Sequence, residues 1–440
     1  MAGCSQKATL HKSTLRLCQL GFTAFVTATL VACGGGQSTT TGGETATGGT
    51  TATETASGDA IEIGALMPLT GDLQAYGESA MNGINLAIEE INAAGGVLGR
   101  PIQLAIGDTQ TAPQPSIDAA QKLVSVSGVQ AVVGPMSSGE AIPVAESVTS
   151  KNNVLQISNS ATSPVLTDVN DNDFAFRTVP SDAFQGEALA EVVTQKGMTN
   201  LAIIYVNNDY GQGLAENFQA AFEAAGGEIS GSVPYEQGQA SYRGELQQLA
   251  RGGAEALVLI GYPENGITIL KQSLEENFFD RFVFTDGMKA PEVISAIGAD
   301  FLNGSVGTAP QALTESDAYQ SFVKSYEAKY GEIPPKPYID TAYDAVMLIA
   351  LAMEKAGSTD GTAIRDALRE VANGPGTEVR PGEWSKAAEA IRNGEDIDYV
   401  GASGSLDFDD NGDVSGTFAE WAIEDGKIVT VRVFDPAQVQ

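Results

Sequence analysis

Two adjacent serines in the stretch GPMSSGEA, residues 134–141, are the first residues of this chain whose types and spacing could do chemistry. The apolar run VQAVV precedes them and a helical pattern begins near Ala141. Ser137 and Ser138 are therefore expected where a strand leads into a helix, which is where ligands and reactive groups gather in α/β proteins. Their hydroxyls could serve as nucleophiles or could hold a ligand.

The first 33 residues have the pattern of a secretory signal. Three basic residues come first, and the apolar run 20–32 ends in LVAC at residues 30–33. A basic segment followed by a short apolar segment and small residues is typical of secretion, and the apolar run is too short to span a membrane. LVAC looks like a lipobox, at which bacterial lipoproteins are cleaved and lipidated, so Cys33 is the expected lipidation site. The alternative is a chance cysteine after a weak membrane anchor.

Cleavage before Cys33 would leave a mature chain without histidine. The only histidine is His11, and the only cysteines are Cys4, Cys18 and Cys33. With Cys33 lipidated, no free thiol remains. A Ser-His-Asp triad, a Cys-His pair and a His-containing zinc site then cannot form. We therefore expect no enzymatic activity, no catalytic residue, no cofactor and no metal.

The serines fit a ligand-holding role better than a nucleophilic one. GPMSSG is not the Gly-x-Ser-x-Gly motif, and no histidine base is available. A serine beside free N–H groups at a helix start can hold a carboxylate, although a simple helix cap explains the same pattern. One strand later, the stretch ISNSATSP offers Ser158, Ser160 and Thr162. Two hydroxyl-rich loops at neighbouring strand ends predict one polar crevice.

The elements that would position these loops alternate regularly from Ile61 onwards. Short apolar strands separated by amphipathic helices predict parallel sheets wound in right-handed βαβ units. The scheme restarts after FAFRTVP at residues 174–180, which predicts two lobes joined near 178–181, and helices dominate 316–373. The other expected strands are 61–67, 102–106, 129–134, 153–158, 201–206, 228–235, 256–260 and 281–285, and the expected helices include 76–94, 182–196, 212–225, 241–252 and 264–277.

Two segments fall outside this alternation. Residues 34–59 contain mostly Gly, Thr, Ser and Glu, which predicts a flexible tether. Near the C-terminus, SLDFDDNGDVSGTFAEWAI has the alternation of a β-hairpin. Asp407 to Ser415 match the first nine positions of a calcium-binding loop, but position twelve, which should be a glutamate, is Phe418. We expect a hairpin without calcium.

The charge and composition of the chain limit its partners. Its net charge is −32 at pH 7, and loss of residues 1–32, which carry three basic and no acidic residues, would make it −35. Such a chain repels phosphate backbones, so we expect no binding to nucleic acid. With 440 residues, of which 42% are hydrophobic, it is long enough to form two packed domains.

Taken together, these motifs resemble the type I periplasmic binding proteins, within them the leucine/isoleucine/valine-binding branch of ABC-importer receptors. The resemblance runs from Ile61 almost to the C-terminus, and its anchors in family order are IGALMPLTGDLQAYGESAMNGINLAIEEINAAGG, VVGPMSSGEAIPVA, ISNSATSPVLT, NNDYGQGLAENF, GYPENG, VFTDGM and FDDNGDVSG. It implies an α/β fold of two lobes, each a mostly parallel sheet flanked by helices, with hinge crossings near 180, 309 and 416. Lobe 1 would comprise 60–179 and 309–415, and lobe 2 would comprise 180–308 and 416–440.

The resemblance also implies a ligand-binding role for eight residues. Ser138 and Thr162 would hold a ligand α-carboxylate, and Ser160 would offer its main-chain carbonyl to the α-ammonium. Asp286 would be the acidic partner of that ammonium, where branched-chain receptors carry a glutamate. A buried ammonium needs such a carboxylate, and charge-assisted hydrogen bonds are strong. Aromatic side chains would close over the ligand and line its side-chain pocket, namely Tyr76, Tyr210, Tyr262 and Tyr338.

One departure from the family pattern concerns a small disulfide. Leucine-type receptors link the serine loop to the loop after the second strand. Here that second loop, GDTQTAPQP, has no cysteine, and Ser137 stands at the other end. The resemblance therefore leaves the preferred ligand side chain open.

The function expected from the resemblance is that of an extracytoplasmic substrate-binding lipoprotein of an ABC importer. It would trap an L-amino acid, branched-chain or otherwise neutral, between closing lobes and present it to permease subunits. We expect a monomer that contacts the membrane only through its lipid anchor. The alternatives are the same fold binding urea, a short amide or an aromatic acid, or an extracellular amino-acid sensor module.

Overall fold

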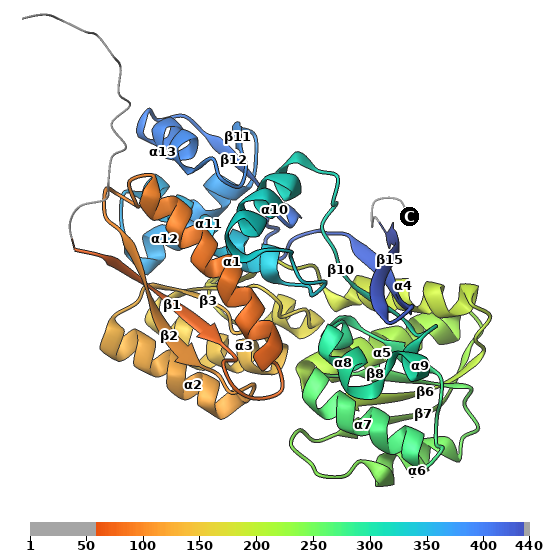
Figure 1. Cartoon of the computed structure of the whole chain (residues 1–440). Coiled ribbons are helices and arrows are strands. Elements are labelled where there is room, and N and C mark those ends of the chain that lie inside the picture. Colours follow the sequence, from red (N-terminus) through yellow and green to blue (C-terminus); the bar gives the residue numbers. More distant parts are fainter. Residues whose placement is uncertain (1–58, 435–440) are drawn as a thin grey trace, which may run out of the picture. The chain divides into compact units, whose positions relative to one another are not determined.

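The computed structural model describes residues 59–434, which belong to one folded unit (Figure 1). Two large sheets and one small sheet organise this unit. The predicted signal, the lipidation site Cys33 and nearly all of the predicted tether lie outside the described residues.

The first sheet consists of five parallel strands in the order β2-β1-β3-β4-β5. Its strands are β1 (Ile61–Met67), β2 (Ile102–Asp108), β3 (Ala131–Val133), β4 (Leu155–Ser158) and β5 (Ala175–Arg177). Ile63 and Ala65 of β1 belong to an apolar core that includes α1 (Gln74–Ala93) and α11 (Ile339–Ala356). Leu66 belongs to a separate core with α2 (Pro113–Lys122). Because helices cover both faces, β1 is a continuous apolar run rather than an alternating one.

The second sheet has seven strands in the order β15-β14-β10-β9-β8-β6-β7. Five of them are parallel, whereas β14 pairs antiparallel with both β10 and β15. Its strands are β6 (Asn200–Val206), β7 (Glu228–Tyr235), β8 (Ala256–Ile260), β9 (Phe282–Phe284), β10 (Val306–Pro310), β14 (Phe418–Glu424) and β15 (Lys427–Phe434). A small third sheet contains β11 (Thr377–Val379), β12 (Ile397–Gly401) and β13 (Gly404–Ser405).

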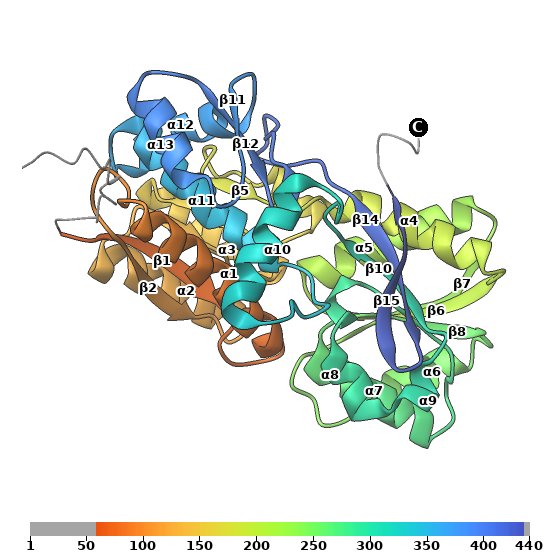
Figure 2. The same cartoon turned by 45° about the horizontal axis from the view of Figure 1, so that its top comes forward.

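Helices flank both large sheets, and Figures 1 and 2 show two lobes, the second built on β6–β10 with α4 to α9. Local sequence sets the helix starts: the side chains of Ser181 and Asn208 accept backbone N–H groups at the starts of α4 and α5. The remaining helices are α3 (Ser138–Val144), α4 (Asp182–Gln195), α5 (Asp209–Ala224), α6 (Arg243–Ala250), α7 (Pro263–Glu275), α8 (Pro291–Ile297), α9 (Ala299–Leu302), α10 (Asp317–Tyr330), α12 (Gly361–Ala372) and α13 (Trp384–Arg392). The predicted α/β class with mostly parallel sheets is confirmed.

The chain passes between the two large sheets three times. The first connection follows β5, the second follows β10, and the third precedes β14. Backbone hydrogen bonds join the second and third connections, because Gln311 N donates to Thr417 O at 3.0 Å. The lobes are therefore discontinuous in sequence.

The predicted C-terminal hairpin at 405–423 is wrong. Residues 406–417 form an irregular loop, and the hairpin lies later, between β14 and β15. The carboxylate of Asp409 accepts the backbone N–H groups of Asn411 and Asp413 at 2.8 and 3.0 Å, which closes a local turn instead of a strand ladder. Asp425 and Gly426, both at positive φ, form the turn of the actual hairpin.

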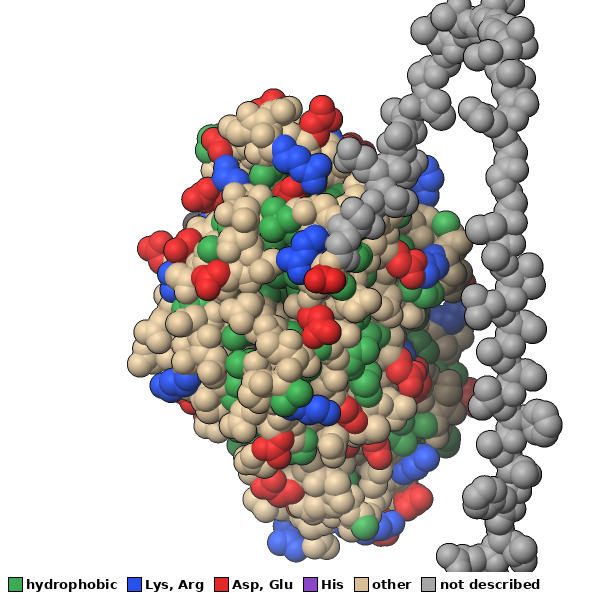
Figure 3. Space-filling model, turned by 90° about the vertical axis from the view of Figure 1, so that its left-hand side faces the viewer, with side chains coloured by type: hydrophobic (Ala, Val, Ile, Leu, Met, Phe, Trp, Pro, Cys, Tyr) green, Lys and Arg blue, Asp and Glu red, His purple; other side chains and the backbone are tan. Residues whose placement is uncertain are grey.

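The surface carries both signs of charge despite the acidic composition. On the face shown in Figure 3, acidic and basic side chains are interspersed rather than gathered. That face therefore presents no broad surface of a single charge. Within residues 59–434, no helix has the combination of length and apolar character that crossing a membrane requires.

Candidate functional site

A pocket of about 310 Å³ lies between the lobes, beside the carboxyl ends of strands from both sheets. It brings together seven of the eight predicted ligand-binding residues, and only Thr162 does not line it. Its lining residues are Leu73, Tyr76, Met136, Ser137, Ser138, Ser160, Tyr210, Tyr262, Asp286, Gly287 and Tyr338. Asp286 is the only charged residue among them.

The serine loop joins β3 to α3 and is positioned by its own hydrogen bonds. Ser137 precedes α3, and its backbone N–H donates to the carboxylate of Glu140 at 3.2 Å. The Ser138 hydroxyl accepts the backbone N–H of Ser163 at 3.1 Å, and the Ser160 hydroxyl donates to the Met136 carbonyl at 2.8 Å. These bonds hold the two hydroxyl-rich loops against each other, as their places at neighbouring strand ends predict.

Thr162 is directed away from the pocket. Its hydroxyl donates to Oδ2 of Asp182 at 2.7 Å, and its carbonyl accepts the Asp182 backbone N–H at 2.8 Å. Asp182 opens α4, so these bonds connect the hydroxyl loop of one lobe to the other lobe. In this structure Thr162 joins the lobes rather than facing the enclosed space.

Asp286 is the acidic centre of the pocket. It follows β9 and is only 4% exposed. Its carboxylate accepts hydrogen bonds from three side chains: Tyr338 Oη at 2.6 Å, Tyr210 Oη at 2.8 Å and Gln185 Nε2 at 2.8 Å. Burial raises the pKa of Asp286, whereas these donors lower it. The carboxylate is thus anchored by neutral donors and forms no ion pair with a cation of residues 59–434.

Four tyrosines surround this carboxylate. Tyr210 and Tyr262 stack with ring centroids 5.7 Å apart, and Tyr76 lies 6.3 Å from Tyr338. Tyr76 Oη also donates to the Asp286 carbonyl across the lobes at 3.0 Å. Burial, followed by the charge of Asp286, raises the pKa of Tyr76, Tyr210 and Tyr338 well above the usual phenol value, so these phenols are neutral donors.

The sequence analysis did not predict three side chains that hold the residues of this site in place. Gln185 donates to Asp286, Asp182 accepts from Thr162, and Arg177 donates to the carbonyl of Ser163 at 2.9 Å. Ser181-Asp182 has the sequence of an ordinary helix start, and Gln185 lies one turn later. The sequence signal that could have indicated them is the spacing of Asp182 and Gln185, which places two polar side chains on one face of the helix directly after the first connection.

A second set of contacts between the lobes lies outside the pocket. Asp72, between β1 and α1, accepts hydrogen bonds from Gln237 Nε2 at 2.7 Å and from the side-chain amide of Asn265. Both partners belong to the other lobe. Burial raises the pKa of Asp72. The two lobes are therefore joined directly at Asp72 as well as at Asp286.

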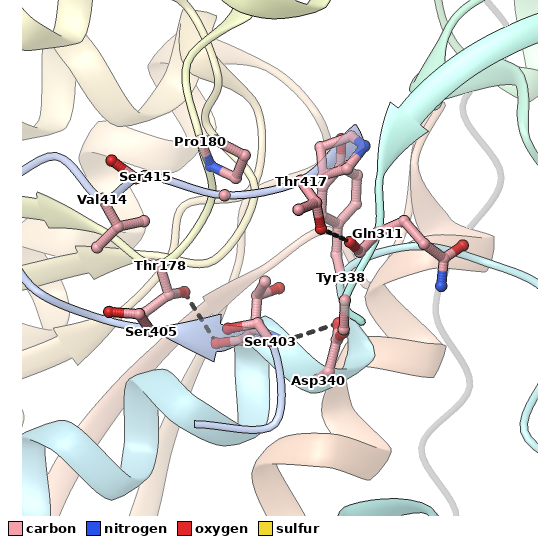
Figure 4. A pocket seen from close by; sticks show the side chains of 14 residues that line it. Thr178, Pro180, Gln311, Tyr338, Asp340, Ser403, Ser405, Val414, Ser415 and Thr417 are labelled. Carbon is pink, nitrogen blue, oxygen red and sulfur yellow. Dashed lines mark hydrogen bonds between the residues drawn. The ribbon is translucent and has the colours of Figure 1, made fainter. Parts of the chain in front are cut away.

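A further pocket of about 370 Å³ lies at the connections between the lobes (Figure 4). Figure 4 shows Thr178 and Pro180 of the first connection, Gln311 of the second, and Ser415 and Thr417 of the third around it. The Thr178 hydroxyl donates to the Thr341 carbonyl at 2.9 Å. Tyr338 lines both this pocket and the ligand-site pocket, so the connections and the candidate site share a side chain.

The acidic C-terminal loop uses its carboxylates internally. Asp413 forms a 2.6 Å ion pair with Arg177 and accepts from the Thr167 hydroxyl at 2.7 Å. Among residues 59–434, no three His, Cys, Asp or Glu side chains are arranged to hold a metal ion. In this loop Asp413 joins the third connection to β5.

The fold and the pocket define a class of protein, a two-lobed receptor that encloses a small molecule. A family model described as periplasmic binding protein matches residues 60–389. The chain is 31% identical over 375 residues to the Leu/Ile/Val-binding protein homolog 3 of Brucella melitensis, covering 84% of this chain and 93% of that protein. The chain belongs to the type I periplasmic binding proteins, in their leucine/isoleucine/valine-binding branch, as its motifs predicted.

Solved structures show the same fold. The leucine-binding protein LivK of Thermotoga maritima has a TM-score of 0.74 at 25% identity, covering 86% of this chain and all of that chain. The branched-chain amino acid transporter substrate-binding protein LivJ of Streptococcus pneumoniae, in complex with isoleucine, has a TM-score of 0.71 at 26% identity, with 86% and 100% coverage. The family is a substrate-binding class and implies an extracytoplasmic location.

Ser138→Ala is expected to weaken ligand binding moderately. Loss of one hydroxyl costs about 1–3 kcal/mol, or roughly fivefold to 150-fold in Kd, because backbone donors in the same loop remain. Isothermal titration with the ligand that stabilises the protein most would measure this change. Ser147→Ala is the matched control, because that exposed hydroxyl donates to the Pro143 carbonyl one turn earlier and does not line the pocket. Equal affinities of both variants and the wild type would remove Ser138 from the site.

Proposed function

We propose that this protein is the substrate-binding lipoprotein of an ABC importer and that it binds a neutral L-amino acid, branched-chain or similar, between its lobes. The observation that carries this proposal is that, among residues 59–434, the only charged residue lining the pocket is Asp286, whose carboxylate is buried. A buried carboxylate without a protein cation favours a ligand that brings one. An α-ammonium supplies that charge.

The rest of the pocket fits the other parts of an amino acid. Ser137 and Ser138 lie on the opposite lobe from Asp286 and offer hydroxyl and backbone donors to an α-carboxylate. Leu73, Met136 and the rings of the four tyrosines provide apolar surface for a side chain. Names of relatives that state leucine, isoleucine and valine binding support this assignment. Urea, short amides and aromatic acids lack the ammonium that Asp286 would pair with.

The proposed mechanism is binding coupled to closure, without covalent chemistry. A ligand that touches Ser138 on one lobe and Asp286 on the other binds the closed state better than the open one, and this difference drives closure. The three connections act as the hinge between the lobes. Lobe 1 comprises 60–179 and 309–415, and lobe 2 comprises 180–308 and 416–440. The closed monomer is then presented to the permease subunits.

A thermal-shift screen of the mature protein tests this function. Neutral L-amino acids are expected to raise the melting temperature, because a ligand that binds only the folded state stabilises it by mass action. Urea, short amides and aromatic acids are expected to have no effect at equal concentration. Stabilisation by one of these alone, with none from any amino acid, would overturn the assignment.

Anchoring through Cys33 is part of the proposal and gives a separate prediction. Cys33→Ala is expected to move the protein from the membrane fraction to the soluble fraction and to abolish labelling with palmitate, because LVAC would no longer offer a thiol for lipidation. Cys18→Ala is the matched control and should retain the label. A Cys33→Ala variant that remains fully labelled would refute the lipobox interpretation.

A further inference from the structure

Three carboxylates and one guanidinium lie close together behind the candidate site. The carboxylates belong to Asp182, Asp286 and Asp413, and the guanidinium belongs to Arg177. Arg177 Nη2 pairs with Asp413 at 2.6 Å, so its charge is matched. Asp182 and Asp286, which are 0% and 4% exposed, have no ion-pair partner among residues 59–434. Two buried carboxylates therefore lack a cation.

The two carboxylates differ in how many hydrogen-bond donors stabilise their ionised form. Asp286 accepts three side-chain hydrogen bonds. Asp182 accepts one, from Thr162 at its Oδ2 atom, and its buried Oδ1 atom has no hydrogen-bond partner within the described chain. A buried carboxylate oxygen without a donor is costly as an anion, and a bound proton removes that cost. The proton of this pair belongs on Asp182.

The titratable and charged groups that face Asp182 are Asp286, Arg177, Tyr210 and Tyr338. Burial raises the pKa of Asp182 well above its usual value, and the charge of Asp286 raises it further, whereas the Thr162 bond and Arg177 lower it. The two phenols remain neutral and take no part in the exchange. The largest charge effect that a ligand can change is therefore the repulsion between Asp286 and Asp182.

We propose that binding of a ligand ammonium at Asp286 releases a proton from Asp182, so that the site exchanges a proton for an organic cation. This inference rests on the proposed function. The ammonium neutralises Asp286 and ends its repulsion of Asp182. The O–H bond of the Asp182 carboxyl group then breaks, its electron pair stays on the carboxylate, and the proton passes to the buffer. The ammonium keeps all its protons. Asp182 acts through Asp286 and need not touch the ligand.

Isothermal titration with L-leucine in phosphate and in Tris buffer tests this exchange. A released proton protonates the buffer, so the observed heat depends on the ionisation enthalpy of the buffer. The slope of the observed heat against that ionisation enthalpy gives the number of protons released per ligand. We expect release that approaches about one proton per ligand in a pH window above the ordinary carboxyl pKa, because burial raises the pKa of Asp182, and affinity should rise there by up to about tenfold per pH unit. Equal heats in both buffers across this range would overturn the inference.

Three variants separate this exchange from a merely structural role. Asp182→Asn keeps the size of the side chain and is expected to bind leucine without proton release and with flat affinity across the window. Asp340→Asn, a change at a half-buried acid with a raised pKa outside the ligand pocket, should release protons like the wild type. Thr162→Val removes a donor from Asp182 and should shift the release to higher pH, which keeps the inference testable if Asp182→Asn does not fold.

The outcomes distinguish the exchange from the proposed function. Proton release by Asp182→Asn equal to that of the wild type would overturn the exchange and leave the amino-acid assignment intact. If no neutral amino acid binds in either buffer, the proposed function fails and the exchange fails with it. Leucine binding with buffer-dependent heat in the wild type and in Asp340→Asn, but not in Asp182→Asn, is the supporting result.

Discussion

Asp286→Ala is expected to reduce affinity for neutral amino acids by about 2–5 kcal/mol, which is roughly thirtyfold to several thousandfold in Kd. Within the described part of the chain, Asp286 is the only charged residue lining the pocket, and truncation would leave a ligand ammonium buried without a counter-charge. The fold should survive, because the hydrogen bonds of this side chain within the described residues are those from Tyr338, Tyr210 and Gln185, and no ion pair is lost. Isothermal titration gives the affinity, and circular dichroism checks the fold.

Ligand chemistry supplies the control for this prediction. A deaminated analogue, which keeps the carboxylate but lacks the amine, should bind the wild type poorly and should be nearly indifferent to Asp286→Ala. The analogue thus tests the ammonium contact itself and not the shape of the pocket. If Asp286→Ala binds the amino acid as tightly as the wild type does, the ammonium site lies elsewhere and the amino-acid assignment loses its main support.

Arg177→Met is expected to lower the free energy of unfolding by about 3–5 kcal/mol. The Arg177 side chain is fully buried, pairs with Asp413 and donates to the Ser163 carbonyl. Its loss leaves a mostly buried carboxylate without a cation and a buried carbonyl without its donor. Equilibrium unfolding in urea measures the change. Affinity should also fall, since Arg177 holds the hydroxyl loop to the third connection.

The matched control for this change is Arg243→Met. Arg243 also pairs with carboxylates, those of Glu275 and Glu276, but its side chain is 43% exposed. Exposed ion pairs contribute about 0–1 kcal/mol, so this variant should unfold almost like the wild type. If both variants show the same small decrease in the free energy of unfolding, the buried Arg177–Asp413 pair does not stabilise the fold more than an exposed ion pair does.

The strands were predictable where burial on both faces leaves a continuous apolar run. The expected bounds 61–67 and 256–260 coincide with those of the buried strands β1 and β8. The bounds 228–235 also coincide with those of β7, an edge strand whose residues are mostly exposed or half-buried. β10 was missed because its sequence, VGTAP, contains Gly, Ala and Pro, which are weak strand signals. It becomes a strand through pairing with β9 and β14, which lies more than a hundred residues away in the sequence. Such long-range pairing leaves no local trace.

The candidate site could be predicted where a residue lies at the end of a strand and also belongs to a recognisable motif. Ser138, Ser160 and Asp286 meet both conditions, and the structure gathers them in one pocket. Asp182 and Arg177 do not meet both: Asp182 begins α4, and Arg177 ends β5 but lies in no recognisable ligand motif. Their roles come from burial and from partners far along the chain, such as Asp413 for Arg177. A single sequence contains no record of such pairings.

The hydrogen bonds of Asp72 have a kinetic consequence. This carboxylate joins the lobes through the side chains of Gln237 and Asn265, none of which lines the enclosed pocket. A molecule held in the pocket can escape only after the lobes part, and parting breaks these bonds along with those at Asp286. The residence time of the cargo therefore depends in part on side chains that never touch it. Substitutions at Asp72, Gln237 or Asn265 can therefore change the dissociation rate of the ligand without changing which ligand the pocket prefers.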